Sequence, residues 1–227
     1  MRNILEIDSV ILEFGAKRVL QDVYLKSETG NITGLLGRNG TGKSCLMRIL
    51  FGELNPDNKS VRINGKALIS AYRSPHDLKY LPQGRFIPKS LTIKRIFKDF
   101  VLDFSDFTDL FPELTKYYMS ALGRLSGGER RIIEIYTILA SATKFCLLDE
   151  PFSHVMPVHV EAIKKLILRE KENKGIVITD HLWQHIVGIC DNLYVINNGQ
   201  TYLTKSIQDI ERLGYINHNA TRSFNAE

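Results

Sequence analysis

The chain has few cysteines and no long apolar stretch. Its 227 residues include three cysteines, which are too few and too scattered for a disulfide framework or a zinc site. No run approaches the roughly 20 consecutive apolar residues that cross a bilayer. Residues 1–6 are too few and too charged for a signal peptide. We therefore expect a cytoplasmic protein with reduced thiols, free or docked on a partner.

The chain also lacks a strong charge imbalance. Its formal net charge is +5, and it has no lysine- or arginine-rich block and no interleaved aromatic pattern of a nucleic-acid module. A solvated surface explains most of the basic residues, and nucleic acid is not an expected partner. Hydrophobic residues make up 44% of the sequence, so a chain of this length can bury the core of one large domain.

Residues 37–44 read GRNGTGKS and fit the phosphate-binding pattern G-x-x-x-x-G-K-[ST] at each fixed position. An expected strand over 32–36 precedes this P-loop, and an expected helix over 45–51 follows it. The glycines let backbone amides surround an anion, and the helix N-terminus adds the positive end of its dipole. Lys43 can reach the β- and γ-phosphates, and the Ser44 hydroxyl can hold Mg²⁺. A chance match has odds of about one per cent, so we predict a nucleoside triphosphate site.

Cys45 follows this motif directly. Its expected place near a helix N-terminus and close to Lys43 predicts a lowered thiol pKa and a reactive thiolate. A thiol reagent should then inactivate the protein, and bound ATP should protect it.

Alternating buried strands and helices predict an α/β fold: a P-loop NTPase core with a mostly parallel sheet, an N-terminal antiparallel β subdomain and a small helical insertion. The expected strands cover residues 4–7, 9–14, 19–27, 32–36, 61–63, 80–82, 145–148, 176–179 and 193–196. The expected helices cover residues 45–51, 128–140, 158–171 and 182–189. Residues 84–124 contain no strand pattern and form the insertion. The polar tail from residue 217 is expected to be disordered.

Phenylalanines recur at spacings of three and four in the insertion, at Phe97, Phe100, Phe104, Phe107 and Phe111. On one helix they would form an aromatic stripe that could dock a partner helix. Core packing of a small helical subdomain is the favoured interpretation. Asp103, Ser105 and Asp106 also suggest that the helix breaks there.

Residues 144–151, KFCLLDEP, indicate a buried strand that ends in two carboxylates. A strand beside the P-loop strand would deliver Asp149 to Mg²⁺, usually through water. Glu150 could then polarise the attacking water as a general base. Adjacent acids at a strand end can also serve as a helix N-cap, but beside a P-loop the functional interpretation dominates.

Leu125 precedes the segment Ser126-Gly127-Gly128-Glu129, which opens the helix expected over 128–140. Backbone amides and a hydroxyl at this turn can bind a second anion. Ser126 and Glu129 also fit a capping box, and the two interpretations are compatible.

These motifs, in this order, resemble the nucleotide-binding subunit of an ATP-binding cassette (ABC) transporter. The likeness covers about residues 5–216, with Walker A at 37–44, the signature at 125–129 and Walker B at 145–149. It implies adenine stacking on Phe14, where the family more often has tyrosine. The full set of implied ATP-binding residues is Phe14, Gly37, Arg38, Asn39, Gly40, Thr41, Gly42, Lys43, Ser44 and Cys45.

The resemblance also assigns chemical roles. Lys43, Glu150 and His181 are the implied catalytic residues, and His181 would contact the γ-phosphate. Ser44, Gln83 and Asp149 are the implied metal-site residues. Gln83 would also sense a transmembrane partner. A lone histidine after a strand is more often structural, and its place in this ordered set reverses that expectation.

The same resemblance implies one domain over residues 1–216, with the insertion at about 84–124. It implies a head-to-tail homodimer in which the signature residues Ser126, Gly127, Gly128 and Glu129 of one copy complete the ATP site of the other. It further implies a separate membrane permease and a peripheral location on the inner face of the cell membrane. Segments 126–131, 149–152 and 178–181 resemble the lipopolysaccharide-export and branched-chain amino-acid branch.

Two alternatives stay open. One is a soluble ABC-type ATPase in translation, DNA repair or cluster assembly, although the chain has one cassette and no sustained heptads. The other is a slow regulatory nucleotide-binding module, which rests on one departure from the family. Residues 153–157 read SHVMP, and Met156 stands where this loop, the D-loop, usually has aspartate. A thioether cannot accept the hydrogen bonds of a carboxylate, so we expect slower or less coupled hydrolysis.

Overall fold

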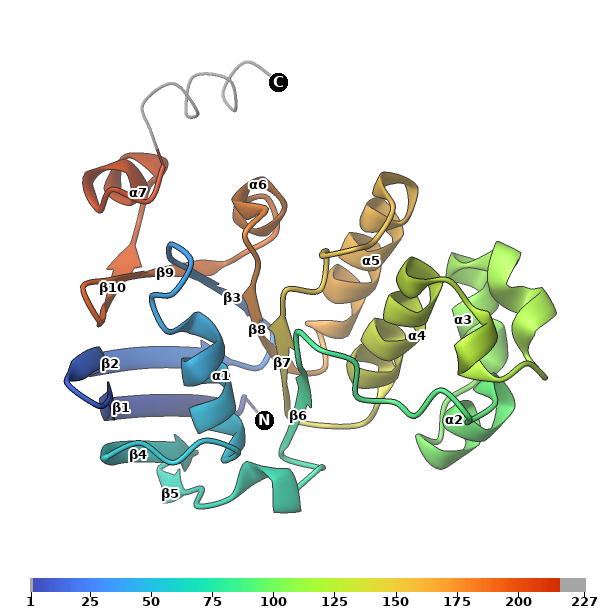
Figure 1. Ribbon diagram of the computed structural model, residues 1–227, viewed down its shortest axis with the longest axis horizontal. Helices are drawn as coiled ribbons and strands as arrows, with labels where there is room; N and C mark the ends of the chain where they lie inside the picture. The colour runs from blue at the N-terminus through green and yellow to red at the C-terminus, as the bar shows by residue number, and fades with distance from the viewer. Residues whose placement is uncertain (1, 217–227) are drawn as a thin grey trace.

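The computed structural model describes residues 2–216 as two sheets with helices packed around them (Figure 1). The expected disordered tail lies outside the described residues. The α/β class with an antiparallel sheet, a mostly parallel sheet and a helical insertion is confirmed. No helix among the described residues is both long enough and apolar enough to cross a membrane.

The antiparallel sheet has the order β2-β1-β4-β5. Its strands are β1 (Ile4–Phe14), β2 (Lys17–Glu28), β4 (Asn58–Ile63) and β5 (Lys66–Ala67). The expectation of two strands over 4–7 and 9–14 is wrong, because β1 is continuous and pairs with β2. Ser9 has a φ of 57°, and the register shifts between Ile7 and Val10. This bulge produces the interruption that the sequence pattern suggests.

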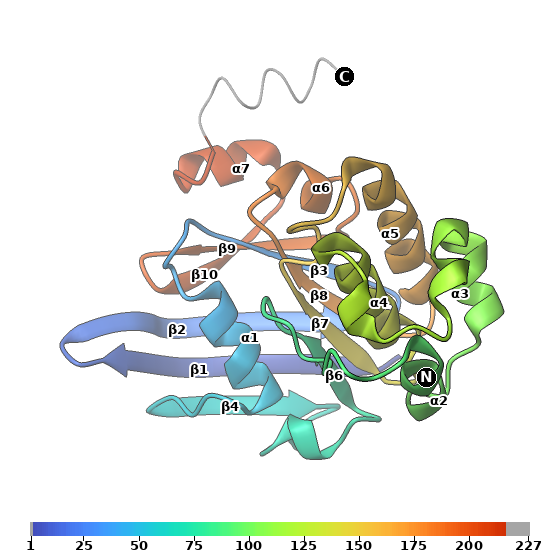
Figure 2. The same cartoon turned by 45° about the vertical axis from the view of Figure 1, so that its right-hand side comes forward.

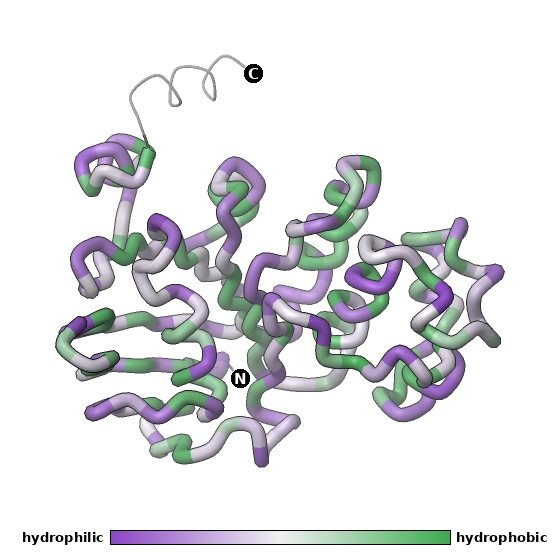
Figure 3. Tube along the Cα trace, in the orientation of Figure 1, coloured by the Kyte–Doolittle hydropathy of each residue, from purple (hydrophilic) through white to green (hydrophobic). Residues whose placement is uncertain are grey.

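The second sheet has the order β10-β9-β3-β8-β7-β6 and is parallel except for β10. Its strands are β3 (Ile32–Leu36), β6 (Leu78–Leu81), β7 (Phe145–Asp149), β8 (Gly175–Thr179), β9 (Asn192–Asn197) and β10 (Gln200–Thr204). Every residue of β3, β7 and β8 is buried, and Figure 3 shows the apolar run of β7 and β8 through the middle of the molecule. We expected β7 to lie beside the P-loop strand β3. This is wrong, because β8 lies between them.

The helix α1 (Lys43–Phe51) lies between the two sheets (Figure 2) and buries its apolar face there. The helices α4 (Gly127–Ala140) and α5 (Pro157–Glu170) pack against each other on the opposite face of the parallel sheet. The expected helix over 182–189 is shorter, since α6 covers Trp183–Val187. A further short helix that we did not expect from the sequence, α7 (Ile207–Arg212), begins with a capping box at Ser206.

The insertion forms α2 (Ile93–Asp99) and α3 (Phe104–Leu110), followed by 3₁₀ turns at Pro112–Tyr117 and Leu122–Arg124. Asp103 caps α3 by accepting from the Ser105 amide at 2.8 Å, so the predicted break is confirmed.

The aromatic residues of the insertion form a core between helices and no stripe on a single helix. Phe97, Phe107 and Phe111 are buried. The rings of Phe97 and Phe107 contact Tyr136 of α4, with centroids 5.7 and 4.9 Å away. Core packing is therefore confirmed over a docking stripe, and these contacts tie the insertion to the helix that begins at the signature motif.

Candidate nucleotide-binding site

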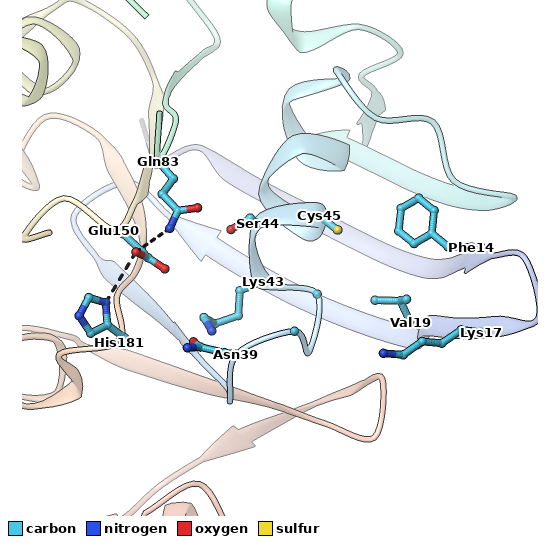
Figure 4. Close-up of a pocket in the computed structure, with 12 residues that line it drawn as sticks. Phe14, Lys17, Val19, Asn39, Lys43, Ser44, Cys45, Gln83, Glu150 and His181 are labelled. Atoms are coloured by element: carbon cyan, nitrogen blue, oxygen red, sulfur yellow. Dashed lines mark hydrogen bonds and ion pairs between the residues drawn. The ribbon is translucent and has the colours of Figure 1, made fainter. Parts of the chain in front are cut away.

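A cavity of about 620 Å³ opens beside the P-loop (Figure 4). It brings together ten predicted site residues. From the P-loop and α1 come Asn39, Gly40, Gly42, Lys43, Ser44 and Cys45, while Phe14, Gln83, Glu150 and His181 approach from other elements. Lys17 and Val19 of β2 also line the cavity and were missed. Lys17 pairs directly with Phe14 across the β1–β2 hairpin, a proximity that a hairpin assignment could have revealed.

The P-loop backbone turns where side chains would not fit. Gly40 and Gly42 have φ values of 79° and 102°, in the left-handed region that favours glycine. A Cβ on Gly42 would lie 2.7 Å from Leu20 Cδ2. Lys43 donates from Nζ to the carbonyl oxygens of Gly37 at 2.7 Å and Arg38 at 3.3 Å. The lysine is therefore already held over the loop that would receive phosphate.

Two predicted ATP-binding residues direct their side chains elsewhere. Arg38 Nη2 donates to the Gly214 carbonyl at 2.5 Å, and Thr41 Oγ1 donates to the Arg38 carbonyl at 2.8 Å. Gly37 and Arg38 line a separate hollow of about 390 Å³ with Tyr215. The Arg38 side chain thus ties the P-loop to the segment after α7, and a role of these residues in ATP binding stays a prediction for the backbone.

Ser44 at the start of α1 and Asp149 at the end of β7 meet, although β7 and the P-loop strand β3 are not neighbours in the sheet. Ser44 Oγ donates to Asp149 Oδ1 at 3.1 Å, and Tyr80 Oη donates to Asp149 Oδ2 at 3.1 Å. Asp149 is 1% exposed, and burial raises its pKa. A hydroxyl and a carboxylate are hard oxygen donors that suit Mg²⁺, which keeps several waters and phosphate oxygens in its coordination shell. These two residues therefore fit an Mg²⁺–nucleotide complex.

Glu150 lines the cavity, and its carboxylate has three neighbours. Oε2 accepts from Gln83 Nε2 at 2.9 Å and Ser153 Oγ at 3.1 Å, and His181 Nδ1 lies 3.6 Å away. Its backbone has a φ of 49°, a strained conformation for a residue with a Cβ. Gln83 therefore faces Glu150 here, and its contact with a metal stays a prediction.

The signature residues lie outside this cavity. Ser126 caps α4, and its reciprocal bonds with Glu129 complete the predicted capping box. A Cβ on Gly128 would lie 2.9 Å from the His154 carbonyl oxygen, so the start of α4 packs tightly against the D-loop. Gly127 lines a separate hollow with Gln83 and His154, and none of the signature residues lines the cavity beside the P-loop.

A family model described as "ABC transporter" matches residues 20–153. The chain belongs to the ABC transporter family. It is an ATP-binding and ATP-hydrolysing subunit of that family, whose ATP-binding subunits work with transmembrane permease components.

Curated relatives and solved structures of ABC proteins match nearly the full chain. The lipopolysaccharide export ATP-binding protein LptB of Acidithiobacillus ferridurans is 32% identical over 92% of this chain and 93% of its own length. The branched-chain amino acid transport ATP-binding protein BraG of Pseudomonas aeruginosa is 28% identical, over 86% and 90%. A solved ATP-binding subunit of an ABC transporter superposes with a TM-score of 0.78 at 21% identity, over 93% of this chain and 94% of that one, and shares the fold.

Arg131 is a buried residue of this ABC site that the sequence analysis used only as a branch marker. Its guanidinium donates to the carbonyl oxygens of Pro82 at 2.8 Å, Asp149 at 2.8 Å and Glu150 at 3.1 Å. Glu134 lies 3.6 Å away as its counter-ion. One side chain of the signature helix therefore fixes the backbone before Gln83 and at both Walker B carboxylates. An arginine in the first two turns of the helix that opens at the signature motif was the available signal.

Asp180 was missed as well. It is fully buried, and its carboxylate accepts from the Phe152 amide and the Leu182 amide, both at 3.0 Å. These bonds hold the start of the D-loop and the segment after His181 in one position. Burial raises the pKa of Asp180.

The reactive-thiolate prediction for Cys45 is wrong. The thiol lines the cavity, but burial raises its pKa in spite of the nearby Arg48. Burial also raises the pKa of Cys146 to about 12 and the pKa of Cys190 above its usual range. Desolvation outweighs the helix N-terminus here, so all three thiols stay protonated near neutral pH.

Proposed function

We propose that the chain hydrolyses Mg²⁺-ATP at a site completed by a second copy, and that this cycle powers a separate membrane permease. The observation that carries the proposal is the Glu150 carboxylate, held between Gln83 and His181 in the wall of a cavity that Lys43 also lines. A carboxylate in this position can orient water and accept its proton. The relatives named above support a transport role.

Each residue then has a defined task. Phe14, 54% exposed at the cavity rim, offers a flat surface for adenine. Lys43 compensates phosphate charge, and Ser44 and Asp149 would hold Mg²⁺. When bound, Mg²⁺ would neutralise charge on the β- and γ-phosphate oxygens. Glu150 takes the proton of the attacking water, and His181 lies within reach of the same carboxylate.

The second copy is proposed because the signature turn lies outside its own chain's cavity. In a head-to-tail dimer, Ser126, Gly127 and Gly128 would add backbone amides to the γ-phosphate, where charge develops during in-line attack. We further propose that residues 1–216 act as one ABC ATPase domain and that the subunit docks on the inner face of the cell membrane through its permease.

The test compares wild type with Glu150→Gln, using Glu172→Gln as the matched control on an exposed surface. We expect Glu150→Gln to lower ATP turnover at least 100-fold, to keep ATP affinity within about threefold, and to accumulate an ATP-dependent dimer in light scattering. Wild-type turnover in Glu150→Gln would contradict the assigned base. Loss of turnover without an ATP-dependent dimer would contradict the two-copy site, and negligible turnover of wild type with its permease present would favour the regulatory alternative.

A further inference from the structure

Tyr80 and Asp149 face each other across neighbouring strands of the parallel sheet. The strands β6 and β7 pair in parallel, with Tyr80 opposite Leu147. Side chains two residues apart point to the same face of a sheet, so Asp149 shares the face of Leu147 and Tyr80. That face is covered by α1, whose start carries Ser44. The phenolic oxygen lies 3.1 Å from Asp149 Oδ2.

The two oxygens of Asp149 are therefore held by two hydroxyl donors from different elements. Ser44 Oγ at the start of α1 donates to Oδ1, and Tyr80 Oη of β6 donates to Oδ2. The Tyr80 ring also packs on Phe51 at the end of α1, with ring centroids 5.3 Å apart. Tyr80 thus contacts the P-loop helix through its ring and the Walker B carboxylate through its hydroxyl.

We propose that Tyr80 is a positioning residue for the Mg²⁺ of this site. Rotation of a carboxylate about its terminal torsion is soft, and donors on both oxygens fix it so that Oδ1 faces Ser44. A carboxylate that is already oriented loses less entropy when it receives the ion, and outer-shell donors to a ligating group tune metal affinity in this way. The inference rests on the proposed Mg²⁺-ATP function.

A purely structural role for the hydroxyl makes a different prediction. A buried tyrosine hydroxyl usually has a hydrogen-bond partner, and Tyr80 is 7% exposed. If the bond served folding alone, its loss would lower thermal stability and leave the Mg²⁺ requirement of nucleotide binding unchanged. The two roles are therefore separated by a binding measurement.

The experiment measures equilibrium binding of a fluorescent ATP analogue to wild type and Tyr80→Phe, first in EDTA and then across an Mg²⁺ titration. We expect Tyr80→Phe to need about tenfold more Mg²⁺ for half-maximal enhancement of binding, with binding in EDTA unchanged within twofold. Tyr72→Phe is the matched control, because Tyr72 also contacts Phe51 but is 48% exposed. It should behave as wild type.

A double-mutant cycle with Asp149→Asn tests whether the effect passes through this carboxylate. In the Asp149→Asn background, Tyr80→Phe should change the Mg²⁺ requirement less than twofold. Three results would overturn the positioning role. They are an unchanged Mg²⁺ requirement in Tyr80→Phe, a loss of binding in EDTA equal to the loss with Mg²⁺, and failure of Tyr80→Phe to fold. Absence of Mg²⁺-enhanced binding in wild type would instead overturn the proposed function.

Discussion

The loops that follow β3 and β7 reach the same cavity but are built in opposite ways. The loop after β3 is the P-loop, which turns on glycines such as Gly40 and Gly42. The loop after β7 turns at Glu150 and His154, which have φ values of 49° and 64°. A backbone that must surround an anion needs residues without a Cβ. A loop that must present a carboxylate cannot use glycine there, so neighbouring side chains hold its strained backbone.

The strongest way to break the first loop is Gly42→Ala. The new Cβ would combine a φ of 102° with a 2.7 Å approach to Leu20 Cδ2, at a cost of about 2–4 kcal/mol unless the loop or the Leu20 side chain shifts. We expect ATP affinity to fall about 100-fold in equilibrium binding. Gly40→Ala is the matched comparison, because its Cβ would meet nothing within 4 Å and only the φ of 79° adds strain. An equal loss in both variants would contradict the steric argument.

The second loop depends on Arg131, which binds both of its first carbonyl oxygens. Removing the guanidinium alone would leave Glu134 buried without a counter-ion and cost about 3–5 kcal/mol, so the variant is Arg131→Met with Glu134→Gln. We expect ATP turnover to fall about 30-fold with ATP affinity within threefold. The P-loop is untouched, while the carbonyl groups of Pro82, Asp149 and Glu150 lose their shared donor.

Arg95→Met is the control for the loss of an arginine, since Arg95 pairs with Asp99 on the surface. It should keep wild-type turnover. A double variant of Arg131 and Glu134 that loses ATP binding and turnover in equal proportion would show that Arg131 supports the whole fold and not this loop in particular.

Asp180 gives the second loop a pH dependence that the first does not share. Burial raises its pKa above the ordinary 3.8, so the folded state holds a proton that the unfolded chain releases. Its contribution to stability is present below the ordinary pKa and falls as pH rises through the folded pKa. Asp180→Asn removes this term. We expect the melting temperature of the variant, relative to wild type, to rise as the pH increases above the ordinary aspartate pKa.

The measurement is a series of thermal melts in which only the difference between the two proteins is compared, because other carboxylates titrate in the same range. Asp99→Asn, at an exposed ion pair, supplies the control. A difference that stays constant with pH, or that moves the other way, would contradict the raised pKa.

The glycine loop after β3 can be predicted from the sequence better than the loop after β7, for a physical reason. A P-loop is local, because its glycines, lysine and serine act within eight consecutive residues. The support of Glu150 and its loop is not local, since Arg131 lies on α4 and Asp180 follows β8. The strand order could not be predicted for the same reason. The strand β8 separates β3 from β7, and no local pattern within β3 or β7 indicates that neighbour. The prediction of a lowered Cys45 pKa was wrong because burial of the thiol, unlike its closeness to a helix start, cannot be inferred from local spacing.

We expect the smallest effect from a substitution at Met156, at the end of the loop after β7. Met156 occupies the N-cap of α5 with no side-chain cap bond and is 57% exposed. Met156→Asp should therefore do two things: stabilise the fold by about 0.5–2 kcal/mol through the cap, and raise ATP turnover a fewfold if the carboxylate restores coupling between sites. Urea unfolding and ATP turnover measure these separately.

Val158→Asp distinguishes charge from position, because it places the same carboxylate in the first turn of α5 at a residue that is 73% exposed. It gains only the helix-dipole term of about 0.3–1 kcal/mol and should leave turnover unchanged. If Met156→Asp gains stability while turnover stays flat or falls, the D-loop departure matters for helix capping alone. The catalytic role of the loop after β7 is then limited to Glu150 and the residues that hold it, and Met156 does not slow hydrolysis.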